Sequence, residues 1–554
     1  MNGLMMEMPL LISSIIEHAA RHHGHAEIVS RRIESNHPDG DLHRYNYAQC
    51  NKRAKQLADS LQKLGLADSE RFATLAWNGY RHMEIYYAVG GKGSVVHTIN
   101  PRLHPDQIAW IVGHAEDQYL AFDLTFLPII QAIAAKCPTV KGWIAMTSEA
   151  FMPDPATVNV PNLYCYETLL QSGSSDFEWP EFDERRAVAL CYTSGTTGNP
   201  KGALYSHRST TLHAYGAALP DAMGASARDS ILPVVPMFHV NAWGLPYTAP
   251  LVGAKLVFPG AALDGKSIYE LFEGEKVTYS AGVPTVWLGL LTYVKQNNFK
   301  FSTFTRTVIG GSACPPAMIK TFNDDYGVEV IHAWGMTEMS PLGTLSKLQN
   351  KHLNESKAVQ DKVLAKQGHV IYGVDMKIVN DEGQELPWDG SSYGNLLVRG
   401  PWVVREYFKA DGGDPLVPDA SGRSWFPTGD VATIDADGYM QITDRSKDVI
   451  KSGGEWISTI DLENLAIAHP AVANAAVIGI LHPKWDERPL LVVVKKPGAQ
   501  VTSEELITFY EGKIAKWWTP DDVQFVDAIP LGATGKILKT KLREQFKDYK
   551  LPTA

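Results

Sequence analysis

The sequence is poor in cysteine, has no block of basic residues and contains no long apolar run. Its five cysteines are odd in number and far apart, which argues against a disulfide framework and against a CxxC metal or redox site. Asp and Glu (61) outnumber Lys and Arg (51), for a net charge of −10, so we predict no nucleic-acid or anionic-membrane surface. No apolar run reaches the roughly 18 residues that a bilayer span needs, and the N-terminus lacks a basic region and a cleavage site. These absences predict a cytoplasmic protein with reduced thiols and no integral membrane segment.

Three histidines, His22, His23 and His25, are clustered near the N-terminus. They stand in a polar stretch without the acidic or cysteine partners that a metal site recruits. We interpret this segment as a solvated turn.

Strand-like and helix-like segments alternate along the chain, whose 554 residues are several times the roughly 150 of a typical domain. A strand at 71–77 precedes a helix at 83–89, and a strand at 255–258 precedes a helix at 266–273. This alternation favours an α/β architecture with parallel sheet. A proline-rich stretch at 151–181 is expected to be loop.

A second change of character falls near residues 443–447, where a strand-like run at 439–442 meets a charged stretch. Beyond it, apolar runs at 471–480 and 490–494 and an amphipathic helix at 503–516 predict a separate core. The sequence therefore predicts a small C-terminal domain behind a short linker.

The most informative segment follows an apolar strand at 187–192 and reads Thr193-Ser-Gly-Thr-Thr-Gly-Asn-Pro-Lys201. Glycines permit close approach of the backbone, and the hydroxyls, N–H groups and one ammonium can surround a chain of phosphates. This composition predicts polyphosphate binding. A Walker loop is disfavoured because Gly202, rather than Ser or Thr, follows the lysine.

This loop resembles the phosphate-loop signature of the acyl-adenylate-forming superfamily, which includes acyl-CoA synthetases, adenylation domains of peptide synthetases and luciferases. Seven further segments look like the remaining motifs of the family, in family order: residues 236–244, 310–313, 334–338, 425–430, 444–448, 451–456 and 530–536. The resemblance spans most of the chain. It implies an α/β fold with a large N-terminal domain of αβ layers and a distorted β-barrel (1–443), a hinge (444–448) and a small mobile α+β lid (449–554).

The resemblance also implies a reaction in two steps, with ATP, Mg²⁺ and coenzyme A. A carboxylate attacks the α-phosphate of ATP to give an acyl-adenylate and pyrophosphate, and a thiol then attacks the activated carbonyl. Because negative charge accumulates in the first step, the reaction needs cationic groups. The implied catalytic residues are Lys536, which bridges carboxylate and α-phosphate, Glu338 and Thr196, which hold Mg²⁺, and His239.

The nucleotide and coenzyme A positions follow from the same motifs. Trp334 is expected to stack on adenine, Asp430 to accept the ribose hydroxyls and Thr337 to bond the α-phosphate. Further nucleotide-binding positions are Thr193, Ser194, Gly195, Thr197, Gly198, Lys201, Gly311, Ser312, Ala313, Gly335, Met336 and Arg445. The expected pantetheine loop contains Lys451, Gly453, Gly454 and Trp456, and it is brought to the site by a swing about Lys447.

The acid is expected to be apolar. Phe238 is followed by His239, where amino-acid-activating relatives have Asp, so an α-amino acid is disfavoured. The expected acyl pocket, which contains His239, Trp243, Gly282, Val283 and Pro284, shows no fixed charge beyond that histidine, and an apolar tail matches it. Residues 236–246 look most like fatty-acid–CoA ligases and 3-(methylthio)propionate–CoA ligases.

Several alternatives stay open. A medium- or long-chain fatty acid is the first expectation, while a short thioether or branched acid, or an aryl acid, is the second. A luciferase-type second step and a non-catalytic nucleotide-binding protein are weaker hypotheses. Only 18 residues follow Lys536, which favours a diffusible acceptor, and the family resemblance suggests a homodimer.

Overall fold

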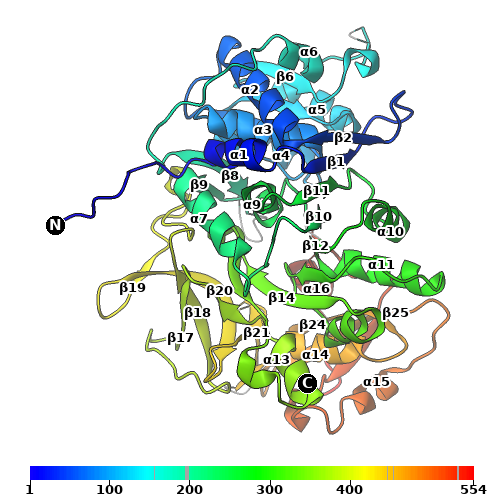
Figure 1. The fold of residues 1–554 in the computed structure, drawn as a ribbon. Helices are drawn as coiled ribbons and strands as arrows, with labels where there is room; N and C mark the ends of the chain where they lie inside the picture. Colours follow the sequence, from blue (N-terminus) through cyan, green and yellow to red (C-terminus); the bar gives the residue numbers. More distant parts are fainter. Residues whose placement is uncertain (155, 194–198, 446, 453–454, 533–535) are drawn as a thin grey trace.

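The computed structural model describes residues 1–154, 156–193, 199–445, 447–452, 455–532 and 536–554. It has an α/β fold with a large N-terminal part and a small C-terminal part, which is orange to red in Figure 1. No described helix is long and apolar enough to cross a membrane.

The first sheet has seven strands in the order β7-β6-β5-β3-β4-β8-β9, parallel except for β9. Its strands are β3 (Arg71–Leu75), β4 (Val95–Thr98), β5 (Asp117–Phe122), β6 (Gly142–Ala145), β7 (Leu163–Cys165), β8 (Ala187–Tyr192) and β9 (Gly202–Ser206). The central strands are apolar nearly throughout because helices cover both faces of the sheet.

The second sheet has nine strands in the order β16-β15-β14-β13-β12-β10-β11-β1-β2, with a parallel centre. Its strands are β1 (Glu27–Arg31), β2 (Leu42–Asn46), β10 (Ser230–Pro233), β11 (Lys255–Phe258), β12 (Tyr279–Gly282), β13 (Arg306–Ile309), β14 (Glu329–Gly335), β15 (Leu342–Leu345) and β16 (His369–Val370).

Helices and the two sheets alternate in five layers. The largest core cluster joins facing residues of both sheets to the helices between them, which are α1 (Ile12–His22), α2 (Tyr47–Lys63), α3 (Tyr80–Gly91), α7 (His207–Ala218) and α9 (Leu245–Val252). Smaller clusters bury the outer faces, the first sheet under α4 (Pro105–Ala115) and α5 (Leu127–Ile133), the second under α10 (Gly265–Gly274), α11 (Pro284–Gln296) and α12 (Pro316–Lys320). Helix α13 (Lys357–Ala365) packs beside α12.

An antiparallel sheet follows and then the small C-terminal part. The antiparallel sheet contains β17 (Asp375–Val379), β18 (Tyr393–Arg399), β19 (Val417–Pro418), β20 (Ser424–Ile434) and β21 (Met440–Arg445). The C-terminal part has its own sheet of β22 (Ile450–Ser452), β23 (Glu455–Ile457), β24 (Val472–His482), β25 (Asp486–Lys495) and β26 (Asp522–Phe525), packed with α14 (Thr459–Ile467), α15 (Ser503–Phe509) and α16 (Lys539–Gln545).

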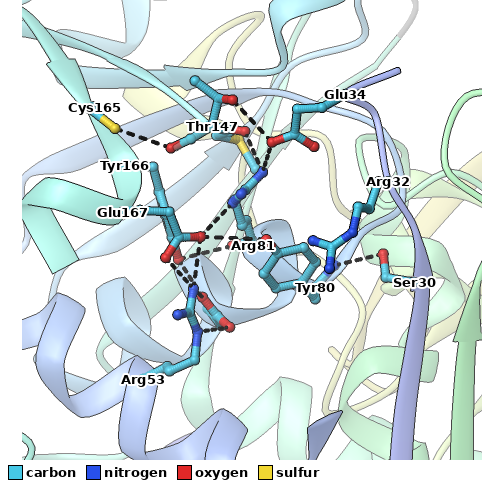
Figure 2. A network of polar contacts seen from close by, with 12 residues as sticks. Ser30, Arg32, Glu34, Arg53, Tyr80, Arg81, Thr147, Cys165, Tyr166 and Glu167 are labelled. Carbon is cyan, nitrogen blue, oxygen red and sulfur yellow. Dashed lines mark hydrogen bonds and ion pairs between the residues drawn. The ribbon is translucent and has the colours of Figure 1, made fainter. Parts of the chain in front are cut away.

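A network of buried charges ties the N-terminal segments together (Figure 2). The Arg81 guanidinium on α3 donates to Glu34 at 2.6 Å and to Glu167 at 2.8 Å, and Glu167 also accepts from Arg53 on α2 at 3.0 Å. Burial disfavours the Glu34 carboxylate, but the neighbouring Arg81 outweighs it and holds the pKa of Glu34 below its usual value. Glu167 is the second residue of α6 (Tyr166–Gln171). The network therefore links four separate segments of the chain: the one with Glu34, α2, α3 and α6.

Two predictions about local structure are wrong. The segment 151–181 is not entirely loop, because Leu163–Cys165 adds edge strand β7 beside Trp143 and α6 then buries Tyr166 and Leu170. The helix expected over 503–516 ends at Phe509, and Gly512 follows in the left-handed conformation with φ +71°, which breaks the helical periodicity.

The connection between the two parts is held by a buried aspartate. Asp444 pairs with Val431 within the antiparallel sheet and is 1% exposed. Its Oδ2 accepts from the backbone N–H and from the hydroxyl of Thr459, both at 2.7 Å. Asp444 therefore fastens the start of α14, in the small part, to the large part.

Candidate functional site

The expected phosphate loop lies where β8 turns into β9. The Thr193 N–H donates to the Lys201 carbonyl at 2.9 Å, and the Thr193 hydroxyl accepts from the Lys201 N–H at 3.2 Å. These bonds close the base of the loop at the carboxyl end of a central parallel strand, where α/β folds bind ligands. Five predicted residues lie outside the described part of the chain: Ser194, Gly195, Thr196, Thr197 and Gly198.

Three predicted nucleotide residues are in contact. Asp430, which is 2% exposed, accepts from Trp334 Nε1 at 2.8 Å and pairs with Arg445 Nε at 2.8 Å. Burial raises the pKa of Asp430, while Arg445 opposes that shift. The Trp334 ring packs on Gly343, where a Cβ would lie 2.6 Å from the ring. One face of the indole is thus covered, and its edge is anchored by a carboxylate.

The segment after Trp334 presents Glu338. Glycine is required at position 335, since a Cβ there would lie 2.1 Å from the Pro341 carbonyl oxygen. The backbone carbonyl of Thr337 accepts a hydrogen bond from the Tyr205 hydroxyl at 2.5 Å. The Glu338 carboxylate is 7% exposed and accepts from the Tyr407 hydroxyl at 2.8 Å. Among the described residues, the Tyr407 hydroxyl donates to one oxygen of this buried carboxylate. The other oxygen suits a hard cation, which prefers oxygen ligands.

Lys536 approaches this cluster from the C-terminal part. Crowding by protein, and then the charge of Arg445, lower the pKa of Lys536 to about 8, although Asp430 and Glu338 attract its ammonium. Solvent still reaches the side chain, and that contact screens these charges. The chain thus brings together residues that lie as far apart in sequence as Glu338 and Lys536.

Lys536 also lines a small cavity of about 50 Å³ with several predicted acyl-site residues. His239, Trp243, Val283 and Gly311 line it, and Gly311 has φ +79°. Burial and then Lys536 lower the pKa of His239 to about 4, so its imidazole is neutral at pH 7. Gly282 and Pro284 flank Val283 but do not line the cavity; Gly282 instead lies against the Trp287 ring.

The prediction that this pocket has no fixed charge beyond the histidine is wrong. Arg102 also lines it, and its guanidinium lies 5.9 Å from the centre of the Phe238 ring. Arg102 comes from the turn after β4, far in sequence from residues 236–246, and no motif marks it. Tyr407, which contacts Glu338 and lies 4.8 Å below the Lys201 ammonium, was missed for the same reason.

The remaining predicted residues lie around or away from this centre. Two of them, Ser312 and Ala313, directly follow Gly311 in the sequence, and Met336 directly follows Gly335. Lys447 lies beyond the end of β21, and Lys451 lies on β22, where its N–H donates to Glu487 at 3.0 Å. The structure thus places Lys536 near Asp430 and Glu338, while the Lys451 N–H is bonded to Glu487 within the C-terminal part. Gly453, Gly454 and the side chain of Trp456 lie outside the described residues.

Comparison with known proteins identifies relatives along the whole chain. The model of the AMP-binding enzyme family matches residues 16–408, and that of the AMP-binding enzyme C-terminal domain matches residues 461–536. A 3-methylmercaptopropionyl-CoA ligase of Ruegeria lacuscaerulensis is 53% identical over 548 residues, 99% of each chain. A medium-chain-fatty-acid–CoA ligase of Ectopseudomonas oleovorans is 53% identical over 551 residues, 100% of this chain and 98% of the relative.

The fold has solved counterparts. The structure of the anthranilate CoA ligase AuaEII in complex with anthranoyl-AMP aligns with a TM-score of 0.83 and 24% identity, over 98% of each chain. At that identity the likeness concerns the fold, and it agrees with the large and small parts described above.

Proposed function

The chain belongs to the AMP-binding enzyme family and is an AMP-forming acid–CoA ligase, and from this premise we propose that its acid is an apolar carboxylic acid, with a medium-chain fatty acid as the first candidate. The observation that carries the proposal is the cavity around His239 and Trp243, which Lys536 reaches from the small domain. None of the described residues that line it is acidic. The ammonium group of an amino acid would therefore find no carboxylate partner among them.

ATP is proposed to bind along the edge formed by the phosphate loop, Trp334 and Asp430. The Trp334 indole is proposed to stack on adenine with the face opposite Gly343. Asp430 accepts from the ribose hydroxyls with lone pairs that Trp334 and Arg445 leave available. Thr193, Lys201 and the loop residues between them surround the phosphates, and Gly311, Ser312 and Ala313 pack against the base.

Glu338 fits a Mg²⁺ ligand because it is a buried carboxylate beside Thr337, and we assign the ion to Glu338 and Thr196. The ion would neutralise charge on the phosphates of ATP. Lys536 supplies the mobile cation: its ammonium lies between the acyl cavity and the Asp430–Glu338 cluster, where it can contact both the attacking carboxylate and the α-phosphate.

The second step is proposed to follow a swing of the small domain about Lys447, within the boundary 444–448. Lys536 leaves, and the loop with Lys451, Gly453, Gly454 and Trp456 lines the passage for the pantetheine of coenzyme A. The position of Lys536 at the acyl cavity supports its role in the first step. Lys451 lies on a different strand of the same small domain, β22, so a rotation of that domain would exchange the two.

Arg102 gives the acyl cavity one cation near His239 and Lys536. It would attract the carboxylate end of the acid, while Trp243, Val283 and Val286 meet the tail. A 3-methylmercaptopropionate-like thioether acid is the second candidate, because a relative with that name is equally similar. An aryl acid is the third.

Pyrophosphate release with Mg-ATP is the test, measured over straight-chain acids from acetate to palmitate, 3-methylmercaptopropionate and a cinnamate, with and without coenzyme A. A maximum of kcat/KM at six to ten carbons supports the first candidate. Each methylene added below that maximum should raise kcat/KM by an amount equivalent to about 1–3 kcal/mol, as in other apolar pockets. A maximum at 3-methylmercaptopropionate transfers the assignment to the second. Pyrophosphate without thioester contradicts coenzyme A as acceptor.

We also propose that the protein is a homodimer, as expected from the family. Light scattering coupled to size exclusion decides this directly: a mass near 61.0 kDa identifies a monomer, and twice that mass a dimer.

A further inference from the structure

His239, together with Phe238, lines two cavities and separates them. One is the acyl cavity, with Trp243 and Lys536. The other is smaller, about 20 Å³, and lies toward the first sheet, where His97 at the end of β4 and Thr193 at the base of the phosphate loop border it. Whatever occupies the small cavity is therefore in contact with the back of the acyl site.

A fully buried Asp–His pair stands beside this small cavity. His97 Nδ1 and Asp117 Oδ2 are 2.8 Å apart, and both side chains are completely shielded from solvent. Among the described residues, neither His97 Nε2 nor Asp117 Oδ1 has a hydrogen-bond partner. Buried polar atoms in native proteins are paired with protein or with ordered water, so His97 Nε2 requires a partner that the chain does not supply.

The cavity has room for one water molecule and for little else. About 20 Å³ exceeds the roughly 10–15 Å³ that one water needs. A buried water also needs two to four polar partners, and Asn100, Thr193 and His239 line the same space as His97. The described residues provide no hydrogen bond to the His239 ring, so that ring has a nitrogen available for the water.

We propose that a single water molecule in this cavity joins His97 Nε2 to His239, so that the buried Asp117–His97 pair fixes the orientation of the His239 ring at the acyl carboxylate. His97 is then a positioning residue, since it acts through His239 and touches no substrate. Asp117 in turn orients His97. This inference rests on the proposed place of His239 in the acyl site.

The position of the pair in the fold supports this role. His97 pairs with Leu190 in the strand that leads to the phosphate loop, and its ring lies 5.1 Å from that of Tyr192. Tyr192 is itself held by a 2.6 Å hydrogen bond to His114. A histidine held on these rigid strands can give His239 a fixed reference, because hydrogen bonds from a well-packed second residue restrict the rotamers of the first.

The water is tested first by a crystal structure of the ligand-free wild-type enzyme at about 1.5 Å or better. We expect one ordered water within hydrogen-bond distance of His97 Nε2 and of a His239 nitrogen. An empty cavity, or a water that contacts His97 but not His239, overturns the inference.

The coupling is tested by a double-mutant cycle on the acid dependence of pyrophosphate release. His97→Phe keeps a ring but removes both nitrogens, and we expect kcat/KM for the acid to fall about tenfold, as for one lost positioned hydrogen bond, with the KM for ATP unchanged. In a His239→Leu background the same substitution should change kcat/KM by less than about twofold. An equal loss in both backgrounds indicates a structural role and overturns the inference.

Two further variants serve as controls for folding and for the loss of a buried histidine. His97→Phe with Asp117→Leu removes the buried carboxylate as well, and it should show the same kinetic loss if His97→Phe alone folds poorly. His207→Phe is the matched control, because His207 is also fully buried with an unpaired Nε2 but lines neither cavity, and it should keep parental kinetics.

The proposed function and this inference fail in different ways. If His239→Leu leaves kcat/KM for the acid at the parental value, the proposed place of His239 is wrong, and this inference falls with it. If His239→Leu is impaired while His97→Phe is not, this inference alone is overturned.

Discussion

The lowered pKa of Lys536 leads to a prediction about the pH dependence of adenylation. Protein crowding and Arg445 lower this pKa to about 8, and only the ammonium form can offset charge at the α-phosphate. With a pKa of about 8, about 90% of the lysine is charged at pH 7 and about 10% at pH 9. The kcat/KM for acid-dependent pyrophosphate release should therefore fall about tenfold between these pH values.

Bound ATP should shift the alkaline limb of the pH–rate profile to higher pH. The triphosphate of ATP favours the ammonium, so the alkaline limb of kcat, which reports the substrate complex, should lie at higher pH than that of kcat/KM, which reports the free enzyme. Lys536→Met should lower adenylation by about 10²–10³, the cost of removing one group that stabilises transition-state charge. Transfer of a preformed acyl-adenylate to coenzyme A should change little.

Lys536→Arg decides whether Lys536 is the titrating group. Arginine stays charged throughout this range, so the variant, although slower, should lose the limb near pH 8. The half-reactions are measured separately, by pyrophosphate release without coenzyme A and by thioester formation from synthetic acyl-adenylate. A limb near pH 8 that survives in Lys536→Arg refutes the reasoning, because another group must then titrate.

Three further outcomes are expected. Arg81→Met leaves the buried carboxylate of Glu34 unpaired and should lower the free energy of unfolding by about 3–5 kcal/mol in urea denaturation at pH 7, whereas the exposed Arg405→Ala should stay within about 0.5 kcal/mol. Because the folded pKa of Glu34 lies below its ordinary 4.5, this contribution is complete above about pH 4.5 and is lost as the pH falls through the folded pKa; a wild-type-minus-variant difference that does not shrink in acid contradicts it. Glu338→Gln should raise the Mg²⁺ concentration that gives half-maximal pyrophosphate release at least tenfold, with unchanged thermal unfolding, and an unaltered Mg²⁺ dependence removes Glu338 from the ligand set. Trp243→Ala opens the acyl cavity and should move the preferred acid to a longer chain in the same acid panel, while an unchanged preference places the chain-length limit elsewhere.

The sequence predicted the layers and the nucleotide cluster because their signals are local. The strands at 187–192 and 255–258 are continuous apolar runs with both faces covered, and the structure has them with the same bounds. Trp334, Asp430 and Lys536 lie in short motifs, and the structure brings them together although they are up to 202 residues apart. The helix over 503–516 was too long because Gly512, in the left-handed conformation, interrupts an otherwise amphipathic pattern.

The contributions that depend on packing were not visible in the sequence. Arg102 reaches the acyl cavity from a turn near the start of the chain, and Tyr407 contacts Glu338 from a segment 69 residues further on. His97 and Asp117 belong to two strands, β4 and β5, that are separated in the sheet by β3. None of these residues has a distinctive neighbourhood in sequence, and only the three-dimensional arrangement gives each a partner.

The bonds between Asp444 and Thr459 have a consequence for the timing of the catalytic cycle. If the small domain rotates about Lys447, Asp444 stays with the large domain while Thr459 moves away, and a carboxylate that is 1% exposed loses two donors at once. The two bonds thus act as a catch that favours the pose in which Lys536 occupies the site. Under the proposed rotation, the resting enzyme would be held in the adenylating pose, and each round of thioester formation would begin by breaking these two bonds.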